Sequence, residues 1–164
     1  MRSRIFATTL LVLVTVYAHA ETDKGEFEGG VVYWQYAKFD PTQKTQAELN
    51  ELTVCAVCPG IDGYLPEFIT EKVWLVGNGK RITVPTSMTE DLFNPHVGPK
   101  YVESAFSVTK LKDKVIINIS GGDGSGSYHA SLIHDPKNMI VTRELRQFPN
   151  PDKPINKKSK LYTK

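Results

Sequence analysis

A strict alternation of apolar and polar residues runs through the second half of the chain. It occupies four segments, residues 101–109, 115–120, 127–134 and 139–146. Successive side chains of a β-strand point to opposite faces, so a period of two predicts antiparallel strands with one buried face. The predicted buried positions are Val102, Phe106, Val108, Val115, Ile117, Ile119, Tyr128, Ala130, Leu132, Met139, Val141 and Leu145.

The first half of the chain contains two further strand signals. Residues 27–39 are rich in aromatic and β-branched side chains, which favour strands, and most of these follow Gly29-Gly30. Residues 73–76 and 81–84 flank Asn78-Gly79. Asn-Gly tolerates the positive φ angles of a tight two-residue turn, so these two runs predict a β-hairpin.

Two capping-box patterns predict short helices. Thr45 stands three residues before Glu48, and Ser87 stands three residues before Glu90. The second helix should end near Phe93, because Asn94-Pro95 follows and the residue before a proline avoids helical geometry. The sequence therefore predicts a mainly β fold, an antiparallel meander or sandwich with one or two short helices.

The N-terminus has the three parts of a secretory signal peptide. A basic start with Arg2 and Arg4 precedes an apolar run, residues 5–16, and the cleavage pattern Ala18-His19-Ala20. The apolar run is shorter than the roughly 20 residues needed to span a bilayer. We therefore expect residues 1–20 to be removed and the product to be periplasmic or secreted.

The predicted domain organisation after cleavage is simple. Residues 21–148 form a single β-rich domain, and we expect the polar, basic segment 149–164 to be a disordered tail. The whole chain has 20 Lys and Arg against 18 Asp and Glu. Since Arg2 and Arg4 belong to the signal, the remaining chain has no net charge, which gives no electrostatic case for nucleic acid as a partner. We expect no membrane span after cleavage.

The only two cysteines, Cys55 and Cys58, form a C-x-x-C pair. Export places them in an oxidising compartment, where we expect a local structural disulfide. A redox-active pair is the alternative, but it would need a helix N-terminus to lower a thiol pKa. The residues after Cys58 are Pro-Gly-Ile-Asp-Gly, which favour a turn instead.

Known enzyme motifs fail on spacing. The glycine-rich run that contains Asp123, Ser125 and Ser127 lacks the Lys of a phosphate-binding loop, the flanking glycines of a hydrolase nucleophile, and the closing Glu of a calcium loop. His129 and His134 have a spacing that strand alternation places on opposite faces, which argues against zinc. We expect no enzyme activity, no cofactor and no bound metal.

The glycine-rich run between two predicted strands is the candidate partner-binding loop. Glycines allow a backbone to approach a partner closely, and Asp123, Ser125, Ser127 and Tyr128 supply the polar groups. The alternative is an ordinary hairpin connection.

Residues 115–130 resemble the central strand–loop–strand of the periplasmic inhibitors of invertebrate-type lysozyme. The match consists of an apolar strand, Gly-Ser-Gly-Ser-Tyr and a second alternating strand. In that family a loop Ser and a Tyr three residues later are inserted into the lysozyme cleft, so the resemblance implies this role for Ser125 and Tyr128. The family's acidic Asp-Gly-Asp-Gly stretch before the first strand is replaced here by Leu111-Lys-Asp-Lys114.

Three functional hypotheses follow from the sequence. The first is an exported binding protein, in particular a lysozyme or glycosidase inhibitor that acts through the loop. Neutral hydroxyl donors could satisfy the two carboxyl groups of a glycosidase cleft without bringing a charge. The second is an envelope-associated structural protein in which the loop is only a turn. The third is a thiol–disulfide protein that uses Cys55 and Cys58.

Overall fold

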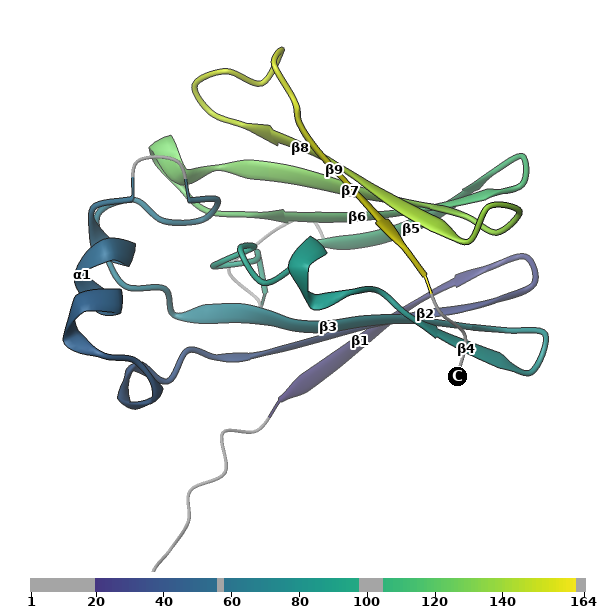
Figure 1. The fold of residues 1–164 in the computed structure, drawn as a ribbon, viewed down its shortest axis with the longest axis horizontal. Coiled ribbons are helices and arrows are strands. Elements are labelled where there is room, and N and C mark those ends of the chain that lie inside the picture. Colours follow the sequence, from purple (N-terminus) through teal and green to yellow (C-terminus); the bar gives the residue numbers. More distant parts are fainter. Residues whose placement is uncertain (1–19, 56–57, 98–104, 162–164) are drawn as a thin grey trace, which may run out of the picture.

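The protein is a sandwich of two antiparallel sheets (Figure 1). The computed structural model describes residues 20–55, 58–97 and 105–161. One sheet has the strand order β1-β2-β3-β4 and the other β5-β6-β7-β8-β9, so each is a meander of consecutive strands. With one short α-helix and three 3-10 turns among the described residues, the predicted mainly β fold is confirmed.

The elements have the following bounds. The four-stranded sheet contains β1 Glu21–Phe27, β2 Gly30–Lys38, β3 Phe68–Gly77 and β4 Lys80–Thr83. The five-stranded sheet contains β5 Phe106–Leu111, β6 Lys114–Gly121, β7 Tyr128–Asp135, β8 Ile140–Gln147 and β9 Ile155–Lys160. The helical pieces are η1 Pro41–Gln43, α1 Gln46–Thr53, η2 Thr86–Met88 and η3 Gly124–Gly126.

The core lies between the two sheets, where the alternation placed it. The predicted inward positions of β6, β7 and β8 are buried and pack against Trp34 and Val73 of the opposite sheet. Val108 and Met139 are half-buried at its margin, and Val102 lies outside the described residues. The indole of Trp34 is fully buried and donates to the Thr70 hydroxyl at 3.3 Å.

Two local signals are confirmed. Asn78 and Gly79 have positive φ angles of 49° and 70° and turn β3 into β4. Thr45 caps α1, and its capping box with Glu48 is complete.

The second predicted capping box is wrong. η2 is a three-residue 3-10 turn that begins at Thr86, its N-cap Pro85 makes no side-chain cap, and Ser87 lies inside it. Leu92 and Met88 are buried between the sheets, so tertiary packing decides the path of this segment. It runs between the two layers in Figure 1.

The predicted disordered tail is also wrong for residues 155–161. β9 pairs with β8 from Ile140↔Lys160 to Leu145↔Ile155, and the next residue, Leu161, is buried. An edge strand needs a hydrogen-bonding partner on one side only, so its composition can be polar and basic. The strand β1 was not predicted either, and it pairs with β2 across Glu28-Gly29.

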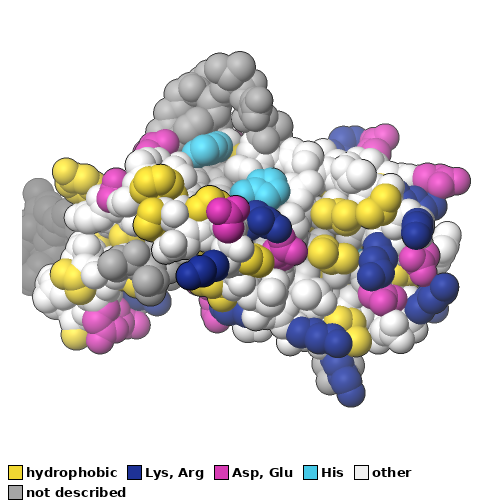
Figure 2. All heavy atoms as spheres, turned by 90° about the horizontal axis from the view of Figure 1, so that it is seen from above, with side chains coloured by type: hydrophobic (Ala, Val, Ile, Leu, Met, Phe, Trp, Pro, Cys, Tyr) yellow, Lys and Arg dark blue, Asp and Glu magenta, His cyan; other side chains and the backbone are white. Residues whose placement is uncertain are grey.

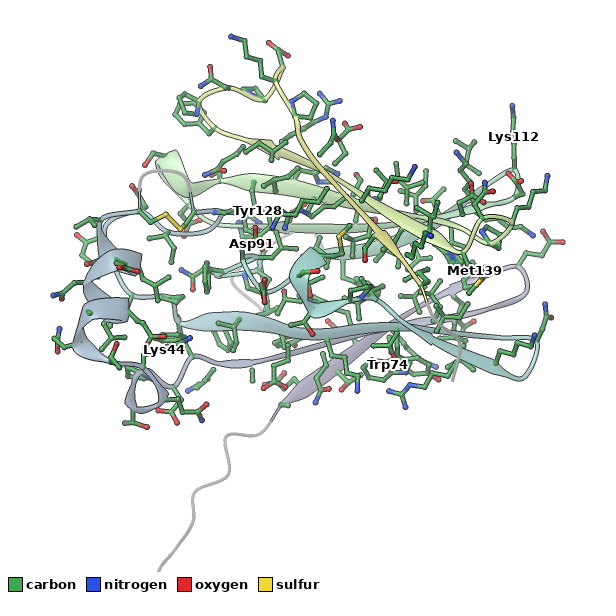
Figure 3. All side chains as sticks on the ribbon, viewed as in Figure 1. Lys44, Trp74, Asp91, Lys112, Tyr128 and Met139 are labelled. Carbon is green, nitrogen blue, oxygen red and sulfur yellow. A yellow bond between two sulfur atoms is a disulfide. The ribbon has the colours of Figure 1, made fainter. Side chains whose placement is uncertain are left out.

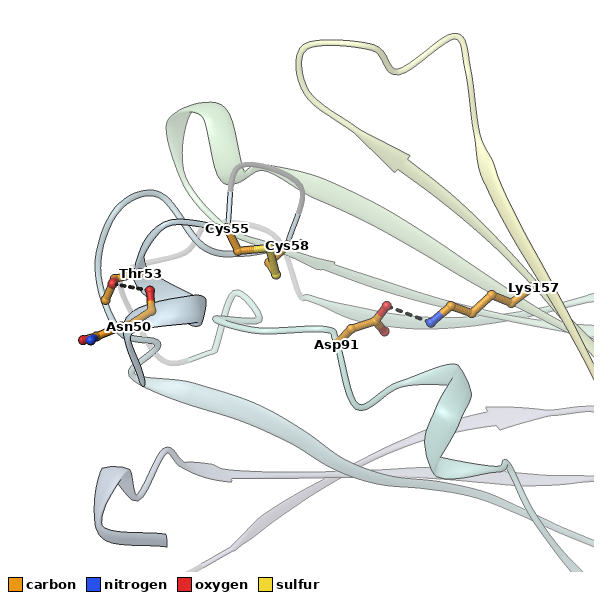
Figure 4. Close-up of a disulfide and its surroundings, with 6 residues drawn as sticks. All are labelled: Asn50, Thr53, Cys55, Cys58, Asp91 and Lys157. Carbon is orange, nitrogen blue, oxygen red and sulfur yellow. Dashed lines mark hydrogen bonds and ion pairs between the residues drawn. A yellow bond between two sulfur atoms is a disulfide. The ribbon is translucent and has the colours of Figure 1, made fainter. Parts of the chain in front are cut away.

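A partly buried cluster of charged side chains connects the segment after η2 to the five-stranded sheet. Arg143 is 1% exposed and points inward from β8, where it binds both oxygens of Asp91 and the carbonyl of Met88. Lys157 of β9 binds the same carboxylate at 2.9 Å (Figure 4). Burial alone would raise the pKa of Asp91, but these two cations hold it below its usual value.

The predicted signal segment, residues 1–20, lies outside the described residues except for Ala20. Within the described part of the chain, no helix has the length and apolar character that crossing a membrane requires.

Candidate functional site

Three loops meet at the end of the sandwich next to α1. We call this the loop end and define it as residues 58–68, 92–97 and 121–127. Backbone hydrogen bonds join the loops directly: Gly60 N–H donates to Gly126 C=O at 2.8 Å, and Phe93 N–H donates to Pro59 C=O at 3.1 Å. The loops therefore form one connected surface, although they are far apart in sequence.

Asn94 is the centre of this connection. Its side-chain oxygen accepts from the backbone N–H groups of Glu67 and Phe68, and its side-chain nitrogen donates to Gly60 C=O at 2.8 Å. Its backbone N–H donates to Phe68 C=O, and its backbone C=O accepts from Gly122 N–H. Asn94 adopts a positive φ of 44°, a conformation that Asn tolerates better than most residues. We call Asn94 and its four partners the Asn94 cluster, which consists of Gly60, Glu67, Phe68, Asn94 and Gly122.

Two glycines make the close contact possible. A Cβ on Gly60 would lie 1.9 Å from the Phe93 carbonyl oxygen, and a Cβ on Gly122 would lie 2.2 Å from that of Gly126. Both glycines also have positive φ angles, 83° and 71°. The glycine-rich sequence therefore serves the packing of the loops against one another.

The predicted loop residues divide into exposed and buried ones. Asp123 is the N-cap of η3 and Ser125 lies within η3, and both are exposed, whereas Ser127 is half-buried. The Ser125 hydroxyl donates to the Asp62 carboxylate. The Asp123 carboxylate lies 3.9 Å from His96 Nε2, whose ring also contacts Gly122 C=O at 2.7 Å.

Tyr128 does not have the exposed position that the resemblance implies. Its side chain is only 5% exposed and points inward from β7 (Figure 3). Its hydroxyl is buried and has no hydrogen-bond partner among the described residues. Burial, with the nearby negative charge of Asp91, raises the pKa of this phenol. In this conformation Tyr128 packs the core and cannot be inserted into a partner.

A cleft of about 370 Å³ opens at the loop end. Three carboxylates, from Asp62, Glu67 and Asp123, lie around it together with Tyr64 and Leu65. Tyr64 is 81% exposed, which is unusual for an aromatic side chain. Figure 2 shows hydrophobic and acidic side chains together toward the left end, whereas most Lys and Arg lie toward the right end, where Asp and Glu are interspersed with them.

Sequence reasoning missed Asp62, Tyr64, Leu65 and Asn94. The available signal was Tyr64-Leu65 between Gly63 and Pro66, an aromatic–aliphatic pair inside a turn-rich segment. Loops lie on the surface, so such a pair is expected to be exposed. The role of Asn94 depends on contacts 26 to 34 residues away and has no local signal.

Cys55 and Cys58 are bonded, with Cα atoms 5.4 Å apart, as Figure 4 shows. Cys55 follows the C-terminal end of α1, and its N–H donates to Leu52 C=O. The negative end of a helix dipole disfavours a thiolate. The pair also lines a second cavity, next to α1, of about 660 Å³.

The predicted separation of the histidines is confirmed: His129 is exposed on the outer face of β7 and His134 is buried on the inner face. Within the described ranges, no three His, Cys, Asp or Glu side chains are grouped so as to hold a metal ion.

Comparisons with protein-family models, curated proteins and solved structures gave no match. The functional interpretation therefore depends on the chemistry and geometry of this chain alone.

Proposed function

We propose that this is an exported, non-enzymatic binding protein that captures a basic protein through its loop end. The observation that carries the proposal is the exposed Tyr64 beside an acidic cleft, held on loops that the Asn94 cluster fixes. Rigid aromatic anchors lose little conformational entropy on binding and are frequent hot spots of interfaces. Preorganised loops also lower the cost of association.

The charge of the loop end selects the chemistry of the partner. Asp62, Glu67 and Asp123 surround the cleft, so a positively charged surface would be attracted and an acidic one repelled. The same charges disfavour direct insertion of Ser125 between the two carboxyl groups of a glycosidase. Ser125 is bonded to Asp62, so its insertion would bring the Asp62 carboxylate close to theirs. A lysozyme-type glycosidase remains the first candidate, but with basic residues around its cleft as the docking surface.

The test is a binding titration of the purified protein against lysozymes of the three main animal classes. We expect one class to bind, with an affinity that falls at least tenfold in Tyr64→Ala, since a hot-spot truncation costs about 2 kcal/mol or more. Asp62→Asn with Asp123→Asn should slow association and weaken its dependence on salt.

The matched control is Leu111→Ala, which removes an exposed apolar side chain at the other end of the sandwich. It should leave the affinity unchanged. If no lysozyme binds, the glycosidase as partner is rejected. If a bound lysozyme keeps its affinity in both loop-end variants, the loop end is rejected as the binding surface.

A further inference from the structure

The opposite end of the sandwich contains a cavity that the proposed function does not use. We call it the turn end, formed by the turns at residues 28–29, 78–79, 112–113 and 136–139. Lys112 and Met139 mark it in Figure 3. The cavity has a volume of about 380 Å³, within the range of small-molecule sites. Its rim is made of exposed turn residues, so it is open to solvent.

The walls of the cavity are mainly apolar and come from both sheets. Phe27, Leu75 and Ile82 line it from the four-stranded sheet, and Val115 lines it from β6. A cavity with such walls favours a ligand with an apolar body.

One side chain of the cavity wall, His134, has an unsatisfied polar group. It is 3% exposed, and its buried Nδ1 has no hydrogen-bond partner among the described residues. Burial lowers the pKa of His134, against a smaller opposite effect of Asp135, so the ring is neutral at pH 7. In a neutral imidazole each nitrogen is either a donor or an acceptor, and it is costly to bury either one unpaired, as Nδ1 is here.

The charged groups at the rim are already paired. Lys110, the lysine that lines the cavity, binds the Glu28 carboxylate at 2.7 Å and the Glu28 carbonyl at 3.2 Å. Asp113 binds Lys137 at 3.1 Å. A charged ligand would have to break one of these pairs, whereas a neutral ligand would not.

We propose that the turn-end cavity binds a small neutral molecule with an apolar body and one hydroxyl group that hydrogen-bonds His134. The apolar walls bind the body of the ligand, and the hydroxyl serves as donor or acceptor for the imidazole. This site is independent of the loop end, which lies at the far end of the sandwich (Figure 1).

Three probes with the same ring system test the proposal: 2-naphthol, naphthalene and 2-naphthoate. Each is titrated into the isotope-labelled protein and followed by amide NMR shifts. We expect saturable shifts at Glu28, Gly29, Asn78 and Asp113, and the order of affinity 2-naphthol, then naphthalene, then 2-naphthoate. One hydrogen bond corresponds to roughly a three- to tenfold difference between the first two probes.

Two variants give the site its controls. His134→Leu should reduce the affinity for 2-naphthol to that for naphthalene and leave naphthalene binding unchanged. Ile82→Trp should fill the cavity and abolish binding of both, whereas Thr83→Trp, on the exposed face of the same strand, should not. An amide spectrum of each variant establishes that it is folded, and His134→Phe replaces His134→Leu if the latter is not.

The absence of shifts at the turn end with all three probes would overturn the proposal. Equal affinity of the native protein and of His134→Leu for 2-naphthol would overturn the proposed hydrogen bond to His134. Tighter binding of 2-naphthoate would overturn the assignment of a neutral ligand.

Discussion

At the scale of single residues, two polar side chains of the five-stranded sheet, Tyr128 of β7 and Arg143 of β8, point into the core. The period of two placed Tyr128 on the buried face of β7, and the structure has it there. The resemblance implied an exposed, inserted side chain. Arg143 follows the same period between Val141 and Leu145, but a charged core position could not be predicted because its partner, Asp91, is 52 residues away.

The buried hydroxyl of Tyr128 leads to a prediction with two variants. Tyr128→Phe removes an unpaired polar group and keeps the ring, so the free energy of unfolding should stay equal or rise by up to about 1 kcal/mol. Tyr128→Ala leaves a core cavity and should lose about 3–5 kcal/mol. Urea unfolding measures both. A loss of more than about 1 kcal/mol in Tyr128→Phe would show that the hydroxyl makes a stabilising hydrogen bond.

At the scale of elements, local signals predicted the pieces that depend on neighbouring residues. The Asn78-Gly79 turn and the Thr45 cap are encoded within four residues, and both are confirmed. β9 has no such signal, because Ile155 to Lys160 lack an apolar period and follow several prolines. Its position depends on pairing with β8 and on the contact of Lys157 with Asp91, which the sequence alone does not reveal.

Removal of β9 tests its structural role. Deletion of residues 155–164 exposes the edge of β8 and removes the buried Leu161, whose N–H donates to Met139 C=O at 2.7 Å. The loss of this one side chain alone should cost about 2 kcal/mol of unfolding free energy. Urea unfolding is the measurement, and Lys158→Ser, an exposed change in the same strand, is the control. An unchanged urea midpoint in the deletion would restore the interpretation of a tail.

At the scale of the whole molecule, the two ends of the sandwich differ in chemistry. The sequence predicted a mainly β fold, as a meander or a sandwich, and the buried face of the five-stranded sheet. The ends of the sandwich are built from loops and turns that meet only in the folded chain. The acidic cleft and the turn-end cavity could therefore not be read from composition, which shows no net charge after the predicted signal.

The burial of His134 gives the whole molecule a pH-dependent stability. Its pKa is lowered in the folded state, so below the unfolded value of about 6.5 the unfolded chain binds a proton that the folded chain does not. Stability should therefore fall as the pH falls from about 6.5.

Melting temperatures between pH 7.5 and pH 5 measure this effect. We expect a smaller decrease in His134→Leu than in the native protein. His129→Gln, an exposed change on the same strand, should keep the native dependence. Parallel curves for the native protein and His134→Leu would exclude His134 as the group responsible.

The Asn94 cluster fixes the backbone path of the loop end without using the exposed side chains that determine its surface chemistry. Its bonds join backbone groups to one another and to the Asn94 side chain, while the side chains of Asp62, Tyr64 and Leu65 are exposed and take no part in these bonds. These three positions can therefore vary in sequence while the backbone path is kept, as the hypervariable loops of antibodies do on a constant scaffold. A library randomised at residues 62, 64 and 65, with Gly63 kept for its positive φ of 77°, should yield stable proteins with new specificities, which makes this small sandwich a scaffold for binder engineering.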